Sequence, residues 1–129
     1  MGLSKDYLKD YFFDSYALIE LIKGNSQYLK YGECVVTITL FNLVEVVYAI
    51  FNEFGEEKAH EIYKKFEDCV HDIDYEITIE ALKLKQKYKK RNLSYADCIG
   101  YAFAKRHTLF FLTGDKGFED LENVEFVRK

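Results

Sequence analysis

Hydrophobic residues occur along this chain in short and in long runs, and the two lengths predict two kinds of element. Short apolar or β-branched runs bounded by polar residues are typical of buried strands. Three such runs lie at 11–14 (YFFD), 34–39 (CVVTIT) and 108–113 (TLFFLT). Weaker signals at 70–74 and 124–127 indicate one further short strand and an edge strand.

Longer runs with helical spacing alternate with these strands. They predict helices at 15–23, 40–54, 56–69, 76–91 and 94–106. Strands that alternate with helices favour an α/β fold with a central, mainly parallel sheet. A length of 129 residues fits one domain, spanning 1–129.

Composition narrows the class of protein. Hydrophobic residues make up 49% of the chain, which is typical of a globular domain, and the net charge of −4 predicts no strong general attraction to nucleic acid. Cys34, Cys69 and Cys98 show no metal-site spacing and are odd in number. Without a long apolar run or a signal peptide in residues 1–8, we expect a soluble, cytoplasmic protein.

Two aspartates follow predicted strands. Asp14 ends the run 11–14, and Asp115 lies just past the run 108–113. In parallel α/β sheets, ligands bind outside the carboxyl ends of the strands. Each residue also has a purely structural interpretation, because Asp14 could cap the next helix and Asp115 could be an ordinary turn residue.

Glu45 lies on the helix predicted at 40–54, which is apolar nearly all round. A helical wheel places a broad apolar face opposite Glu45, made of Leu40, Leu43, Val47, Ile50, Phe51 and Phe54. A covered glutamate needs a counter-charge or a metal, whereas a half-solvated one does not. A helix with so few polar positions is usually covered on both sides, by the fold or by a partner subunit, and the second case motivates the hypothesis of a homodimer.

Asp97 begins the helix predicted at 94–106. Ser94 and Asp97 have the spacing of a capping box. On the wheel, Asp97 lies above Gly100 and Ala104, whose small side chains would let another element or a substrate approach. A capped carboxylate keeps lone pairs, so the cap and the ligand interpretations are compatible.

Other candidate chemistry is weaker. His60, His71 and His107 share no metal or triad spacing, and no phosphate-binding glycine loop occurs. The basic run at 83–91 fits a solvated helix face best. It is also the one plausible phosphate-contacting surface, so contact with RNA stays open.

Four segments together resemble PIN-domain ribonucleases, of the kind that act as toxins in VapBC-type toxin–antitoxin pairs. The segments are FFDSYALIEL with Asp14, TITLFNLVEVVYAI with Glu45, LSYADCIGYAFAKR with Asp97 and LFFLTGDKGFEDL with Asp115. Their order and spacing match over nearly the whole chain, although each segment alone is a weak signal.

The resemblance implies a three-layer α/β/α sandwich in which Asp14, Glu45, Asp97 and Asp115 meet as catalytic and metal-binding residues. Thr113 matches a hydroxyl position that supports the metal. Some relatives carry a further acid where this chain has Phe118, with Glu119 one step beyond, which leaves a second metal site in doubt. A small antitoxin that blocks the cleft is also implied.

Clustered carboxylates would need a cation. A like-charge pair at about 4 Å costs roughly 1 kcal/mol in water and about 4 kcal/mol at an effective dielectric of 20. Oxygen ligands select Mg²⁺ or Mn²⁺. The expected activity is therefore metal-dependent hydrolysis of RNA phosphodiesters by an endoribonuclease.

Three other interpretations stay open on the sequence. The first is a PIN-like binding or scaffold protein without catalysis. The second is a phosphoacceptor receiver domain, which the absence of paired acids after the first strand disfavours. The third is an α/β domain with scattered surface acids.

Overall fold

The computed structural model describes residues 9–128, so the segment considered above for a signal peptide lies outside it. The sheet has three parallel strands in the order β1 (Tyr11–Phe13), β2 (Phe110–Thr113) and β3 (Val124–Phe126). Phe12 pairs with Phe111, and Thr113 pairs with Phe126. All three residues of β1 are buried, as expected for a strand covered on both faces.

The segment at 34–39 is strand-like but is not a full strand. A single bridge joins Thr37 to Phe12, and the Phe13 N–H donates to the Thr37 carbonyl at 3.1 Å. The further strand predicted at 70–74 is wrong, because only Val70 bridges, to Ile38. The edge strand predicted at 124–127 is confirmed as β3.

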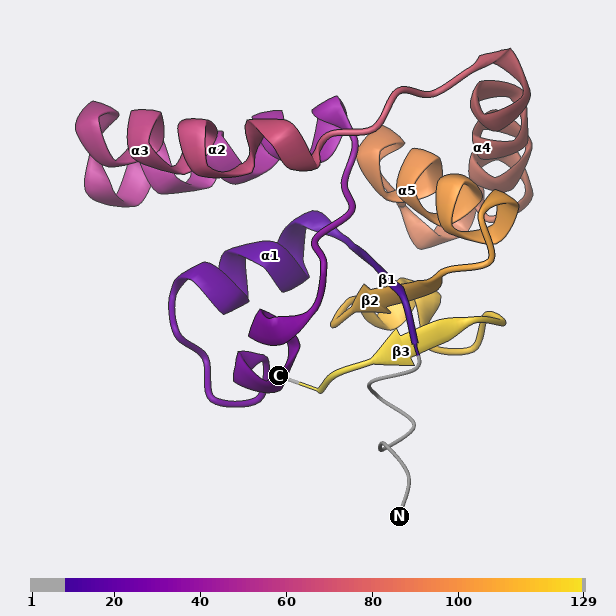
Figure 1. The fold of residues 1–129 in the computed structure, drawn as a ribbon. Coiled ribbons are helices and arrows are strands. Elements are labelled where there is room, and N and C mark those ends of the chain that lie inside the picture. The colour runs from indigo at the N-terminus through magenta and orange to yellow at the C-terminus, as the bar shows by residue number, and fades with distance from the viewer. Residues whose placement is uncertain (1–8, 129) are drawn as a thin grey trace.

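Within residues 9–128, five α-helices cover the two faces of the sheet (Figure 1). They are α1 (Ser15–Ile22), α2 (Leu40–Phe54), α3 (Glu56–Phe66), α4 (Tyr75–Lys87) and α5 (Tyr95–Arg106), and short 3₁₀ turns lie at 29–33, 67–69, 89–91 and 116–118. The prediction carried α4 on to residue 91, but the helix ends at Lys87. A 3₁₀ turn (Lys89–Arg91) and a left-handed Asn92 (φ 58°) follow it.

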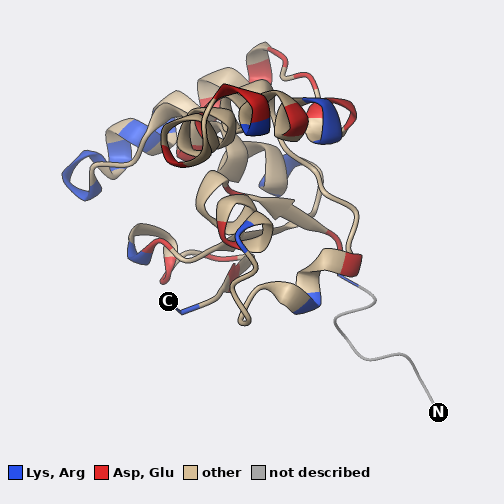
Figure 2. Cartoon of the chain, turned by 90° about the vertical axis from the view of Figure 1, so that its left-hand side faces the viewer, with Lys and Arg blue, Asp and Glu red and all other residues tan. Residues whose placement is uncertain are grey.

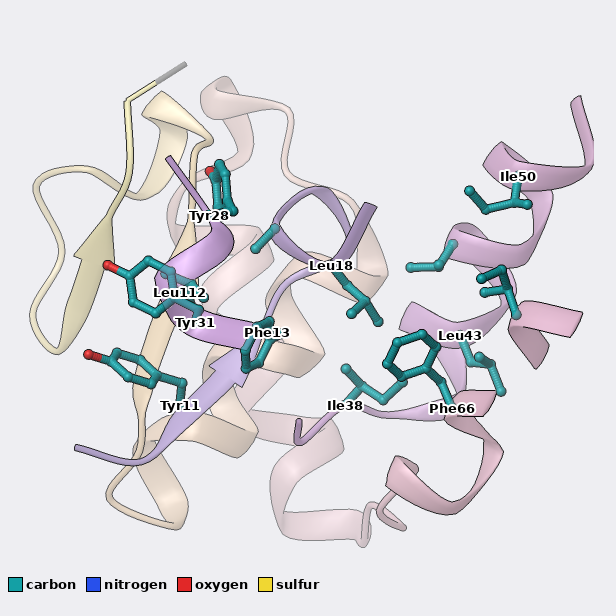
Figure 3. Packing of buried hydrophobic residues seen from close by; sticks show 13 residues of the cluster. Tyr11, Phe13, Leu18, Tyr28, Tyr31, Ile38, Leu43, Ile50, Phe66 and Leu112 are labelled. Atoms are coloured by element: carbon teal, nitrogen blue, oxygen red, sulfur yellow. The ribbon is translucent and has the colours of Figure 1, made fainter. Parts of the chain in front are cut away.

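The two faces of the sheet carry separate cores. Tyr11, Phe13 and Leu112 pack with residues of α1, α2 and α3 (Figure 3). Phe12 and Phe111 point the other way and pack with α4 and α5. Because neighbouring side chains of a strand alternate between faces, each short strand serves both cores. The predicted three-layer α/β/α sandwich is confirmed.

The wheel for α2 was right about Leu43 and Ile50 but wrong about the rest of its buried face. Leu43, Val46 and Ile50 are buried, whereas Phe51 and Phe54 are about half exposed. The helix is therefore rotated from the expected orientation, and an apolar stripe faces outward. That stripe consists of Phe41, Val44, Tyr48 and Phe51.

Gly100 serves the sheet rather than a substrate. A Cβ at this position would lie 2.5 Å from a ring carbon of Phe12 and 3.2 Å from one of Phe111. The glycine therefore lets α5 lie close against β1 and β2. No helix within residues 9–128 is both long and apolar enough to cross a membrane.

Candidate functional site

Asp14 and Asp115 lie at the same edge of the sheet. Asp14 follows β1 directly, and Asp115 follows β2 after Gly114. The two strands are neighbours and parallel, so their carboxyl ends lie side by side. Each acid therefore lies at the end of its strand, where the sequence placed it.

Asp14 is buried, with 1% of its surface exposed. One carboxylate oxygen accepts a hydrogen bond from the Ala17 N–H at 2.7 Å, so the residue does cap α1. The other oxygen accepts from the Thr113 hydroxyl. Burial raises the pKa of Asp14 from 3.8 to about 7, against the lowering effect of these two hydrogen bonds, and the negative charges of Asp97 and Asp115 raise it further.

Thr113 joins two of the acids. Its hydroxyl donates to Asp14 and accepts from the Asp115 N–H at 3.0 Å. The Asp115 carboxylate also accepts from the Gly117 N–H at 2.8 Å, within the turn at 116–118. The interpretation of Asp115 as a turn residue is thus also correct, and the turn fixes its side chain.

Asp97 forms the predicted capping box. Its Oδ2 accepts from the Ser94 N–H at 3.1 Å, and its own N–H donates to Ser94 Oγ at 3.0 Å. Partial burial raises the pKa of Asp97, and the charges of Asp115 and Glu45 add to that rise. The Ser94 N–H uses Asp97 Oδ2, and a capped carboxylate still has lone pairs for a ligand.

Glu45 is held by a relay of side chains that joins the starts of α2 and α1. The N–H and hydroxyl of Thr39 donate to Asn42 Oδ1 at 3.0 and 2.8 Å. Asn42 Nδ2 donates to Ser15 Oγ at 3.1 Å, and Ser15 Oγ donates to Glu45 Oε1 at 2.5 Å. Asn42 and Ser15 therefore orient Glu45.

Three of the four predicted acids line one cleft of about 820 Å³. Its lining residues are Asp14, Tyr16, Asp97, Gly114, Asp115, Lys116, Glu119, Phe126 and Arg128. Glu45 lies outside this lining, although its charge acts on Asp97. Sequence reasoning missed Tyr16, Lys116 and Arg128, for which we find no local signal.

Phe118, which stands where some relatives carry a further acid, does not line the cleft. Phe118 is fully buried, and its ring centroid lies 4.9 Å from that of Phe111. It therefore belongs to the core. Glu119 is exposed and lines the cleft instead.

No residue of the basic run at 83–91 is among those that line the cleft. Figure 2 shows its Lys and Arg residues at the far end of α4 and in the following turn, at the upper left. The cations that line the cleft are Lys116 and Arg128. Arg91, which is partly buried, bonds to the turn after Asp115.

The donor chemistry of the cleft suits a hard cation, since the carboxylates of Asp14, Asp97 and Asp115 supply oxygen ligands. Within residues 9–128, no three acidic, histidine or cysteine side chains lie close enough to ligate one ion as they stand. Mg²⁺ usually keeps several waters and binds through one or two carboxylates, so such a spacing is compatible with it.

Comparison with known proteins gives one family. The sequence profile described as PIN domain matches residues 11–124. No curated protein sequence matches closely enough to count as a relative.

Several solved structures share the fold. One is a toxin–antitoxin complex from Klebsiella pneumoniae, with 24% identity over 90% of this chain and 96% of that chain and a TM-score of 0.70. FitAcB from Neisseria gonorrhoeae is 15% identical over 92% of this chain and 96% of that chain, with a TM-score of 0.67. VapC20 of Mycobacterium tuberculosis is described as a toxin that cleaves the sarcin–ricin loop. It is 14% identical over 78% of this chain and 85% of that chain, with a TM-score of 0.65.

Proposed function

Because the chain belongs to the PIN-domain family, we propose that it is a metal-dependent endoribonuclease and the toxin of a toxin–antitoxin pair. The observation that carries this proposal is the convergence of Asp14, Asp97 and Asp115 on one cleft. VapC20, which shares the fold, is described as cleaving an RNA loop. An RNA substrate and an odd number of cysteines, three, with no metal-site spacing fit a reducing, cytoplasmic setting.

The raised pKa of Asp14, about 7, supports a cation site. Without a cation, this buried carboxyl is about half protonated at neutral pH. A nearby positive charge would favour its ionised form and so offset the cost of burial. The remaining two aspartates, with Glu45 and Thr113 in support, complete the proposed set of residues that would hold Mg²⁺ or Mn²⁺.

Each residue then has a distinct task. A bound Mg²⁺ or Mn²⁺ supplies a Lewis acid for the scissile phosphate and lowers the pKa of water. Thr113 and the Ala17 N–H fix the Asp14 oxygens, and the capping box aims Asp97. Lys116 and Arg128 give the cleft two positive groups that can contact RNA phosphates.

A nuclease assay on wild type and Asp97→Asn, with Mn²⁺, Mg²⁺ or EDTA, tests this function. Wild type should cleave RNA with either metal and stop in EDTA, and Asp97→Asn should fold but not cleave. Asp74→Asn is the matched control, because Asp74 caps α4 through the Ile77 N–H at 2.9 Å and does not line the cleft. Cleavage that survives EDTA would reject the metal mechanism.

The same assay decides the competing function, a PIN-like binding protein without catalysis. The absence of three close ligands within residues 9–128 is the observation that favours it. In that case Mn²⁺ leaves the melting temperature unchanged and RNA is bound but not cut.

Two protein partners belong to the proposal. A cognate antitoxin is inferred because the similar Klebsiella pneumoniae structure is described as a toxin–antitoxin complex. A homodimer is inferred from the outward stripe of α2, in which Val44 is 59% and Tyr48 66% exposed. Apolar patches of this kind mark interaction surfaces.

A further inference from the structure

Asp115 is aimed by the turn that follows it. The Gly117 N–H donates to Asp115 Oδ1 at 2.8 Å, and the Asp115 N–H donates to the Thr113 hydroxyl at 3.0 Å. If the 116–118 turn moved, the Asp115 carboxylate would lose a hydrogen bond that fixes its direction. The position of this acid therefore depends on what holds the turn.

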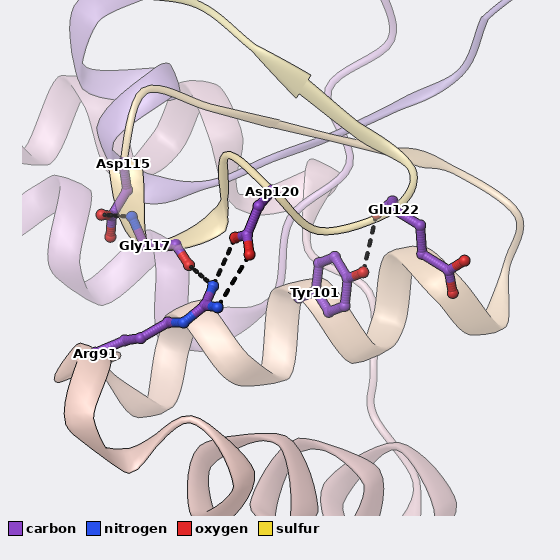
Figure 4. Close-up of polar contacts among 6 residues, drawn as sticks. All are labelled: Arg91, Tyr101, Asp115, Gly117, Asp120 and Glu122. Atoms are coloured by element: carbon purple, nitrogen blue, oxygen red, sulfur yellow. Dashed lines mark hydrogen bonds and ion pairs between the residues drawn. The ribbon is translucent and has the colours of Figure 1, made fainter.

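Arg91 holds the turn from outside (Figure 4). Its Nη1 donates to the Gly117 carbonyl at 2.9 Å and to Asp120 Oδ1 at 2.7 Å, and its Nη2 donates to Asp120 Oδ2 at 3.0 Å. The guanidinium also lies 4.2 Å from the centroid of the Tyr88 ring. A planar fork of donors is what allows one side chain to make these contacts together.

The segment that carries Arg91 also leads to the second acid of the cleft. Arg91 ends the 3₁₀ turn at 89–91, and Ser94, three residues later, caps α5 through the N–H of Asp97. The same segment packs on the turn, since a Cβ on Gly117 would lie 2.9 Å from a methyl carbon of Leu93. Arg91 thus joins the segment that leads into α5, where Asp97 lies, to the turn that holds Asp115.

We propose that Arg91 is a positioning residue that fixes the separation of Asp97 and Asp115 by clamping the 116–120 segment onto the segment before α5. The effect on metal binding and cleavage rests on the proposed function, whereas the effect on the turn does not. An ordinary surface ion pair would have neither effect, because exposed pairs contribute little and touch nothing else.

The test compares Arg91→Gln with Lys105→Gln. Lys105 is the matched control, because its ammonium also pairs with an acid between β2 and β3, namely Glu122, but does not contact the 116–118 turn. Three quantities are measured: amide exchange of Gly117 by NMR, the Kd for Mn²⁺ by calorimetry without RNA, and kcat and KM for RNA cleavage.

In Arg91→Gln, Gly117 should exchange about tenfold faster, and the Mn²⁺ affinity and kcat should each fall by roughly tenfold, the usual effect of losing a group that orients a metal ligand. KM should change little. Lys105→Gln should match wild type in all three. Arg91→Lys keeps the charge but not the fork, so it should behave more like Arg91→Gln than like wild type.

The proposal is overturned if the Gly117 amide exchanges in Arg91→Gln at the wild-type rate. It is also overturned if Lys105→Gln speeds this exchange as much as Arg91→Gln does. If Arg91→Gln does not fold, Asp120→Asn is measured in its place, because Asp120 is exposed and its loss weakens the same clamp. Unchanged exchange of the Gly117 amide in Asp120→Asn also overturns the proposal. If wild type neither binds Mn²⁺ nor cleaves RNA, the proposed function fails, while Gly117 exchange still decides the clamp.

Discussion

The Thr113 hydroxyl donates a hydrogen bond to the buried carboxylate of Asp14, and this contact joins two adjacent strands at the edge where the cleft opens. The partners are 99 residues apart in sequence. Burial favours the neutral form of the Asp14 carboxyl. Of the interactions that favour its ionised form, the hydrogen bond from Thr113 is the largest.

Replacing Thr113 by valine should raise the pKa of Asp14 above about 7, because the hydrogen bond that lowers it is lost. Loss of a hydrogen bond to a charged group costs about 1.5–3 kcal/mol, so the free energy of unfolding should fall by that order at pH 8 and by less at pH 5. Carboxyl NMR titration and urea unfolding measure both effects. Thr78→Val, which removes an exposed hydroxyl from the start of α4, should change neither.

Stability without metal should fall as pH rises. The folded state keeps the Asp14 proton up to a pKa of about 7, whereas the unfolded state releases it near 3.8, so the folded state binds more protons between these values. The stabilisation is fully present below pH 3.8 and is lost as pH rises to about 7, with roughly 4 kcal/mol as its upper limit at 1.36 kcal/mol per pKa unit. Asp97, whose pKa is also raised, acts in the same direction.

Guanidinium unfolding between pH 4 and pH 8 in EDTA, on wild type and Asp14→Asn, checks this dependence. In Asp14→Asn, the free energy of unfolding should fall much less between pH 4 and pH 8 than in wild type. Identical pH slopes for the two proteins would contradict the assignment to Asp14.

The cap and ligand roles of Asp97 should separate by mutation. Ser94→Ala removes a hydroxyl that caps α5, so it should cost about 1 kcal/mol of stability and leave Mn²⁺ affinity unchanged. Asp97→Asn keeps an acceptor for the Ser94 N–H, so it should keep most of the stability and lose Mn²⁺ affinity. Chemical unfolding and calorimetry together measure the two roles, and equal losses of affinity in both variants would count against a ligand role.

Charge on the outward stripe of α2 should break the proposed dimer. Val44→Asp places a carboxylate between Phe41 and Tyr48 on an exposed face, so it should leave the fold intact and raise the dimer Kd by about tenfold or more. Size exclusion with light scattering measures the mass. Val35→Asp, at a site that is 79% exposed and off the stripe, should stay dimeric. A monomeric wild type would remove the proposal.

Gly100→Ala should destabilise the protein by about 1–3 kcal/mol, since overpacking forces side chains or backbone to shift. The added methyl would meet the Phe12 ring at 2.5 Å. Gly32→Ala is the control, because its Cβ would make an ordinary contact of 3.6 Å with Leu21. Thermal or chemical unfolding of the two variants should therefore differ clearly, and equal stability would show that α5 can move away from the sheet.

The sequence by itself determined the features that depend on near neighbours. The strand-then-aspartate order at Asp14 and the Ser94–Asp97 capping box both involve residues within a few positions of each other, and both formed as predicted. The helices likewise began near the predicted residues, since caps and apolar spacing are local signals. The alternation of strands and helices was enough to give the α/β class.

Only the tertiary structure decided which groups are desolvated and which loops are tied together. The rotation of α2, which buries Val46 and exposes Phe51, depends on how neighbouring elements fill the core. The raised pKa of Asp14 depends on burial by distant segments, and the contact of Arg91 with Gly117 spans 26 residues. Such properties arise from packing between remote parts of the chain, which no local pattern encodes.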